Sequence, residues 1–264
     1  MSQLRPTESA RETIRDHLGY SAVSGLVVLV FASLWLFEGY YVLTAWFPSL
    51  YDEVTPINGV AAGTFMTLLF ACSLAALLRP RTSVGPTRVL LVGAGWLGFL
   101  LPLSFVMTEP LVTAVVMLFA AVVLSLVVWL HPARERVLPS GETTVSWPLL
   151  ALTVAIAIPF LWLAAQYQWQ QLTLDDEIAD RWFYGGLSMY LLVIVSLAAA
   201  GTIDGATRRF TGGSAAVLAG MLGLVSIVCS GELHGLGFVG GLLVFGWAIC
   251  VAALTVRVSA VDRS

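Results

Sequence analysis

Eight apolar runs, each long enough to cross a bilayer as a helix, dominate this chain of 264 residues. A helix needs roughly 17–25 apolar residues to cross about 30 Å of hydrocarbon. Helices satisfy their own backbone hydrogen bonds in lipid, and these runs lack the alternation of polar and apolar residues that β-barrel strands show. The predicted spans are residues 21–46, 57–78, 87–107, 110–130, 147–170, 183–203, 213–229 and 235–256.

Composition agrees with this fold class. Hydrophobic residues make up 58% of the chain and charged residues 11%, and the mean hydropathy is +0.89. These values are far from those of a soluble domain. The first apolar run is too long for a cleavable signal peptide, and no small-residue cleavage site follows it. We therefore expect an all-α integral membrane protein with about eight transmembrane helices, the first of them a membrane anchor.

The placement of arginine predicts the orientation in the membrane, because short cytoplasmic loops accumulate Lys and Arg. The chain has no lysine, so its 13 arginines carry the whole signal. All of them except Arg181 fall on one side of the predicted bundle, at Arg5, Arg11, Arg15, Arg79, Arg81, Arg88, Arg134, Arg136, Arg208, Arg209, Arg257 and Arg263. With an even number of spans, both termini are predicted to be cytoplasmic.

The opposite, outer side is acidic. Its predicted loops carry Asp52, Glu53, Glu109, Asp175, Asp176, Glu177, Asp180 and Glu232. A solvated rim, which simply marks where water begins, is the ordinary explanation. Such a face also repels anions and concentrates cations.

Short matches in the same order predict an internal repeat. Leu34-Trp35-Leu36 resembles Leu161-Trp162-Leu163, and Asp52-Glu53 resembles Asp176-Glu177. Gly95-x-Leu-Gly98, which runs on to Glu109, resembles Gly220-x-Leu-Gly223, which runs on to Glu232. Four helices per half give parallel repeats related by an axis along the membrane normal. The predicted organisation is a cytoplasmic tail (1–20), a first four-helix repeat (21–132), a cytoplasmic linker (133–145), a second repeat (146–257) and a cytoplasmic tail (258–264).

Glu38 is the strongest candidate site residue, because it lies inside the first predicted span. A carboxylate at that depth costs about 2–3 kcal/mol on insertion scales unless it is paired, protonated or facing water. Three interpretations remain open. Glu38 reaches the headgroups at the outer interface, binds a proton or cation, or forms a hydrogen bond between helices.

The other candidates for substrate or proton binding are Glu109, Asp176, Glu177, Glu232 and His234, all in outer loops. Glu232 and His234 bring a carboxylate and a histidine within two residues of each other in one predicted outer loop. Both groups carry protons and bind metals. A metal site needs three or four ligands, however, so no metal is predicted, and a tight polar turn between helices is the ordinary interpretation.

Missing motifs exclude several functions. No P-loop occurs, and lysine is absent, so the chain neither hydrolyses nucleotides by that route nor forms a retinal Schiff base. A pI near 5.6 without a basic patch argues against nucleic-acid binding. Histidines are not placed in facing mid-membrane pairs, as bis-histidine haem requires. Cys72, Cys229 and Cys250 show no Cys-x-x-Cys spacing and are predicted to be buried small hydrophobes. No cofactor is predicted.

The sequence leaves the activity open, including whether the chain is an enzyme, and names no catalytic residue. We expect a small-solute or ion-coupled transporter of the permease type. The alternatives are a membrane-embedded enzyme or lipid- or quinone-binding subunit acting at the outer face, and a scaffold subunit without chemistry. Gly237 and Gly241 have the spacing that lets helices pack closely. The predicted environment is the lipid bilayer of a prokaryotic cell membrane, with oligomers and partner subunits left open.

Overall fold

A computed structural model of the chain describes residues 18–33, 36, 42, 56–80, 82–104, 110–137, 144–175, 179, 183–203, 205, 207–232 and 235–261. These residues form helices and the turns between them, without a strand. The result confirms the predicted all-helical class.

The helices follow the predicted spans in order. After an N-terminal helical segment at Leu18–Ser33 come α2 (Pro56–Leu78), α3 (Val84–Ser104), α4 (Pro110–Trp129), the short α5 (Arg134–Val137), α6 (Trp147–Thr173), α8 (Phe183–Ile203), α9 (Arg208–Val228) and α10 (Gly237–Val261). Proline stands at the start of α2, α4 and α6. Its fixed φ suits the first helical turn, where the missing N–H costs nothing.

Within the described residues, five helices are long and apolar enough to cross a membrane, so the chain is a multi-pass membrane protein. They are α2, α6, α8, α9 and Gly237–Ser259 of α10. The other three predicted spans overlap the segment Leu18–Ser33, α3 and α4, and a total of eight crossings remains a prediction. Helix α9 begins at Arg208 rather than at residue 213, because the first turn extends into the arginine-bearing loop.

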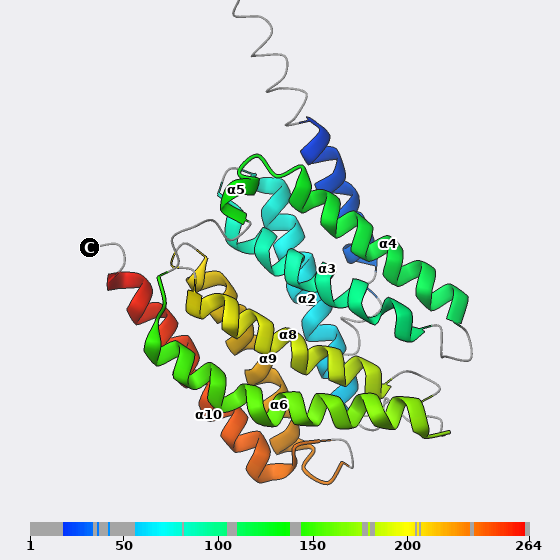
Figure 1. Ribbon diagram of the computed structural model, residues 1–264, viewed down its shortest axis with the longest axis vertical. Coiled ribbons are helices and arrows are strands. Elements are labelled where there is room, and N and C mark those ends of the chain that lie inside the picture. The colour runs from blue at the N-terminus through cyan, green and yellow to red at the C-terminus, as the bar shows by residue number, and fades with distance from the viewer. Residues whose placement is uncertain are drawn as a thin grey trace, which may run out of the picture.

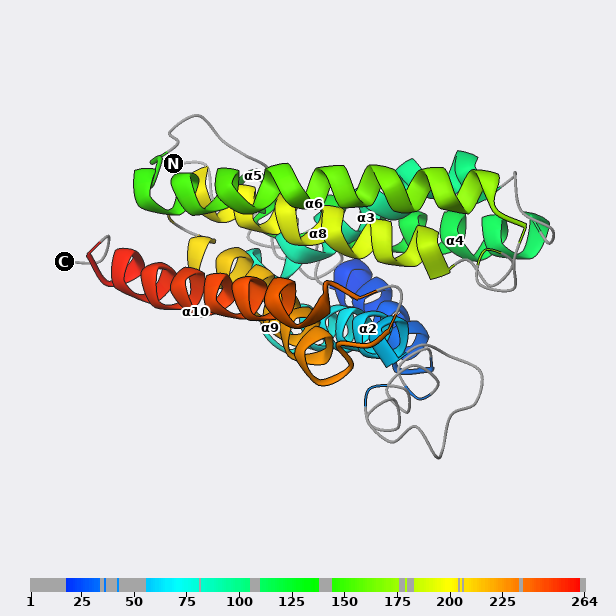
Figure 2. The same ribbon diagram turned by 90° about the horizontal axis from the view of Figure 1, so that it is seen from below.

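Successive helices run back and forth between two ends of a bundle (Figures 1 and 2). Helix α3 packs on α4, α6 on α8, and α9 on both α8 and α10. Helices α2, α3, α8 and α9 also contact one another across the middle of the molecule. Figure 1 shows α5, the start of α6 and the end of α10 gathered toward one end. We call this end the arginine-bearing face, because it carries Arg79, Arg88, Arg134, Arg136, Arg208, Arg209 and Arg257.

The helices are apolar on all sides for two different reasons. Inward-facing side chains such as Phe65, Leu69 and Ile194 form one buried core. Outward-facing side chains such as Ile158 and Leu243 are each 70% exposed, as lipid-facing residues are in the absence of a bilayer. Three exposed tryptophans stand near helix ends, with Trp129 and Trp147 on the arginine-bearing face and Trp169 on the other, as in interfacial belts, whereas the exposed Trp162 lies within α6.

Candidate functional site

Of the six candidate residues predicted on the outer side or in the first span, the structure describes Glu232. It follows α9 and is exposed, and its backbone N–H donates to the carbonyl of Cys229 (3.1 Å). Glu38, Glu109, Asp176, Glu177 and His234 lie outside the described residues. Their convergence with Glu232 therefore stays a prediction.

One cysteine thiol lies beside Glu232. Burial, and secondarily the Glu232 carboxylate, raise the pKa of the Cys229 thiol and so favour its protonated form. Among the described residues no group of three or more His, Cys, Asp or Glu side chains is placed to hold a metal ion. The three cysteines are free thiols.

The arginine-bearing face contains a buried guanidinium that links distant segments. Arg88, in the first turns of α3, donates from Nε to the carbonyl of Val137 (2.8 Å) and from Nη2 to that of Arg136 (3.1 Å). Its Nη1 donates to Thr207 Oγ1 (2.9 Å), just before α9. The carbonyls at the end of α5 have no partner within that helix, so a cation there satisfies them and opposes the negative end of the helix dipole. Arg88 thereby ties α3, α5 and the start of α9 together.

Arg208 makes a second clamp of the same kind. It is 1% exposed, and it donates to the carbonyls of Gly201 (3.1 Å) and Thr144 (2.6 Å). Gly201 lies in the last turn of α8, while Thr144 precedes α6. One guanidinium thus holds the ends of three consecutive helices, and the five-donor fork of arginine suits this task better than an ammonium group.

A hydrogen-bonded chain of His131, Ser83 and Tyr20 lies on the same face. The Ala133 N–H donates to His131 Nδ1 (3.0 Å), so the neutral ring carries its proton on Nε2 and donates to Ser83 Oγ (3.1 Å). The Tyr20 hydroxyl lies 3.4 Å from Ser83 Oγ and donates to the carbonyl of Ala76 (3.2 Å). The Tyr20 and His131 rings also meet edge to face. Burial lowers the pKa of His131, because the imidazolium form is poorly solvated there.

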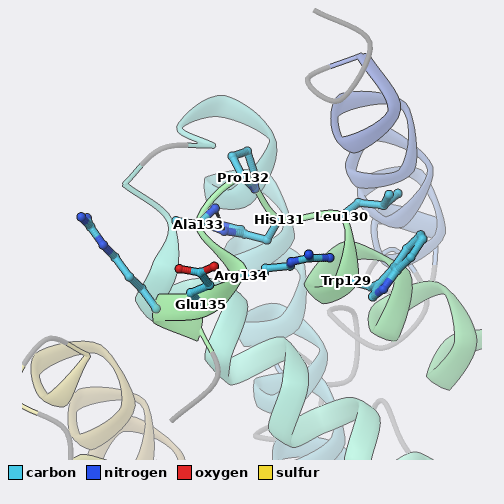
Figure 3. Close-up of a pocket in the computed structure, with 8 residues that line it drawn as sticks. Trp129, Leu130, His131, Pro132, Ala133, Arg134 and Glu135 are labelled. Carbon is cyan, nitrogen blue, oxygen red and sulfur yellow. Dashed lines mark hydrogen bonds between the residues drawn. The ribbon is translucent and has the colours of Figure 1, made fainter. Parts of the chain in front are cut away.

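His131 also lines a cavity of about 690 Å³ formed along the turn from α4 into α5. The lining residues are Trp129, Leu130, His131, Pro132, Ala133, Arg134, Glu135 and Arg136. In Figure 3 the Arg134 side chain extends between His131 and Trp129. The cavity therefore connects solvent to a titratable group that is itself hydrogen-bonded to Ser83. Chemically, this arrangement can hold or pass a proton.

Sequence reasoning missed these residues as a functional group. The sequence shows Arg88 and Arg208 only as charges near loops, and it predicts no role for His131. One available signal was position, because His131-Pro132 directly follows a span and is followed by two arginines. The partners Ser83 and Tyr20 have no signal of their own, since a lone hydroxyl in an apolar sequence predicts nothing specific.

Comparisons with known proteins assign no relative to this chain: no family model, curated protein or solved structure matches it.

Proposed function

We propose that this chain is a small-solute or ion-coupled transporter of the permease type, built from two related four-helix halves in a cell membrane. The observation that carries the proposal is the pairing of helices. In the first half, α3 packs on both α2 and α4. In the second half, α9 packs on both α8 and α10 in the same way. Across the middle, α2 contacts α9 and α3 contacts α8. A two-fold axis that superposes α2 on α8 and α3 on α9 would convert each of these two contacts into the other.

One pair of helices also agrees in length. Both α3 and α9 have 21 residues, and each follows its preceding helix after a short turn. In transporters with parallel repeats, solute sites lie at the interface of the halves, and access alternates as one half rocks against the other. The contacts here include Trp96 Nε1 donating to Ser196 Oγ (2.9 Å) and the bond from Arg88 to Thr207. A rocking motion of one half against the other can break such hydrogen bonds and form others in their place.

The described interior favours an uncharged solute. Its buried charged side chains, Arg88 and Arg208, stand at helix ends on the arginine-bearing face. Deeper polar groups are hydroxyls, such as those of Thr64 and Ser188, and these donate to helix carbonyls. We propose that any coupling proton exchanges with solvent at His131, which links the cavity of Figure 3 to Ser83.

A reconstitution experiment tests the proposal. Proteoliposomes are screened for uptake of labelled sugars, amino acids and nucleosides, with an enclosed pH-sensitive dye as the proton probe. We expect saturable uptake of at least one class above that of protein-free liposomes. The absence of any solute or proton flux would overturn the transporter proposal and favour a scaffold.

Disulfide locks test whether the halves move. In a variant without native cysteines, Gly85→Cys with Phe210→Cys joins α3 to α9 across the halves, since a Cβ on Gly85 would lie 2.7 Å from that of Phe210. Removing the phenyl ring leaves room to relax toward the roughly 3.8 Å that a disulfide needs. The control, Gly220→Cys with Ala248→Cys, joins α9 to α10 within one half, where the corresponding separation is 3.6 Å. Oxidation should stop uptake in the first variant and spare it in the second.

One observation favours a second candidate, a binding subunit for a polar lipid or quinone at the outer end of α6. There Gln168 Nε2 and Gln170 Oε1 are buried and have no hydrogen-bond partner in the described part of the chain. Close by, the rings of Tyr167 and Tyr184 stack with centroids 6.3 Å apart. Buried amide atoms require partners, which a ligand headgroup or bound water can supply. Protection of the purified protein against thermal unfolding by a short-chain quinone, lost in Gln168→Leu, would support this candidate over the transporter.

A further inference from the structure

A second cavity on the arginine-bearing face lies where three helices from both predicted halves meet. It has a volume of about 270 Å³ and is lined by Ala75, Arg79, Thr82, Ser83, Gly85, Pro86, Arg209 and Phe210. These residues come from the end of α2, the turn into α3, and the first turns of α3 and α9. Contacts of α2 and α3 with α9 hold the walls together. The volume is near the lower end of small-ligand pockets and suits a headgroup rather than a large solute.

The electrostatics of this cavity favour an anion. Arg79 and Arg209 both line it and are exposed, so their guanidinium groups are accessible to a ligand. None of its described lining residues is acidic. The first turns of α3 and α9 add the positive ends of two 21-residue helices, and helix N-termini bind phosphate through free N–H groups. By contrast, the cavity of Figure 3 places Glu135 between Arg134 and Arg136 in sequence, which weakens its attraction for anions.

Exposed apolar side chains stand next to both arginines in sequence and form a border that can meet lipid. Phe210, which lines the cavity, is 43% exposed, and Leu78, which precedes Arg79 in the last turn of α2, is 69% exposed. A free phosphate gains nothing from such a border, whereas the acyl chains of a phospholipid continue along it. Basic pockets between transmembrane helices on the cytoplasmic side are a recognised mode of binding acidic headgroups. The predicted orientation puts this cavity at that leaflet.

We propose that Arg79 and Arg209 form a phosphate-binding site for the headgroup of an anionic phospholipid, seated between α2, α3 and α9. The guanidinium forks bind the phosphodiester oxygens, and the exposed Leu78 and Phe210 guide the acyl chains. Because the ligand bridges α2 with α9, its binding stabilises the contact between the two predicted halves. This site is independent of the transporter proposal and stands or falls separately.

Native mass spectrometry of the delipidated full-length protein tests the site. Dioleoylphosphatidylglycerol is the anionic probe, dioleoylphosphatidylcholine the zwitterionic one, and inorganic phosphate the free anion. The test variant is Arg79→Gln with Arg209→Gln, and the matched control is Arg134→Gln with Arg136→Gln, which removes the same charge from exposed positions on the same face. We expect phosphatidylglycerol to bind more tightly than phosphatidylcholine, and the test variant to weaken that binding roughly tenfold or more.

The control separates this site from a general effect of surface charge. The control variant should keep most of the preference for phosphatidylglycerol. The variant Arg79→Lys with Arg209→Lys should keep it as well, and its binding would show that the protein still folds when both arginines are replaced. Inorganic phosphate that competes with phosphatidylglycerol, and no longer does so in the test variant, would support the phosphate-binding site. Binding of inorganic phosphate without any binding of phosphatidylglycerol would overturn the lipid assignment and identify a free anion as the ligand. Equal affinity for both lipids without phosphate binding, or equal losses in test and control variants, would overturn the proposal.

Discussion

At the residue scale, the arginines of this chain have two separate roles. Arg79, Arg134, Arg136, Arg209 and Arg257 are exposed, as the rule relating arginine to cytoplasmic loops assumes. Arg88 and Arg208 are buried and bind backbone carbonyls instead. The sequence does not distinguish the two sets, because most of the carbonyl partners, in α5 and the segment before α6, are 48 to 64 residues away. The count of arginines predicts a cytoplasmic face, which stays a prediction, and gives no indication of the two clamps.

His131 gives the chain a predicted pH dependence of stability. Burial holds its pKa below the ordinary value of 6.5, so the unfolded state binds the proton more readily than the folded state. Stability is therefore fully present above about pH 6.5 and falls as the pH drops below that value. Protonation also removes the acceptor that Nδ1 offers to the Ala133 N–H. We expect the melting temperature in detergent to fall by a few degrees between neutral and mildly acidic pH.

The variant His131→Gln provides the matched measurement for this dependence. It lacks the titrating ring and should lose most of the acid-induced fall in melting temperature. Its melting temperature should be lower than that of the native protein at neutral pH and should change less with pH. An unchanged pH dependence in this variant would assign the effect to other groups.

At the scale of helices, close backbone approach between α9 and α10 determines how the second half packs. A Cβ on Gly223 would lie 2.7 Å from the backbone nitrogen of Phe245, and one on Gly241 would lie 2.8 Å from the carbonyl oxygen of Gly223. The spacing of Gly237 and Gly241 predicted close packing, and the structure confirms this for Gly241. Gly237 instead has a positive φ of 65° at the start of α10, where glycine is favoured for its backbone conformation.

The substitution Gly223→Ala should therefore separate α9 from α10. The obstructing atoms are backbone, which cannot rotate away, so we expect a loss of about 1–3 kcal/mol in the free energy of unfolding. Gly213→Ala, on the same helix, adds a methyl group with nothing within 4 Å and should be neutral or slightly stabilising. Thermal unfolding of both variants in one detergent makes the comparison. Equal melting temperatures would show that the helices part at no cost.

At the scale of the whole molecule, the sequence predicts where the helices lie along the chain, but it does not predict which helices pack against one another. Length and hydropathy alone locate α2, α6 and α8, since the bilayer sets the length of a span. The helices are apolar on every side, so periodicity does not indicate which face meets protein and which meets lipid. The core contacts of Tyr190, whose hydroxyl donates to the carbonyl of Leu218 (2.8 Å), are for this reason invisible in the sequence.

The arrangement of helices predicts which residues each side of the membrane exposes. Asp175 follows α6 and Glu232 follows α9, whereas Arg136 and Arg257 belong to the arginine-bearing face. All four residues are exposed. Single cysteines at these positions, in a variant without the native thiols, are treated with a membrane-impermeant maleimide on intact cells. We expect labelling at Asp175 and Glu232 before permeabilisation and at Arg136 and Arg257 only afterwards. Labelling of one residue from each pair on intact cells would contradict the back-and-forth order of the spans, because helices that connect through short turns must alternate in direction.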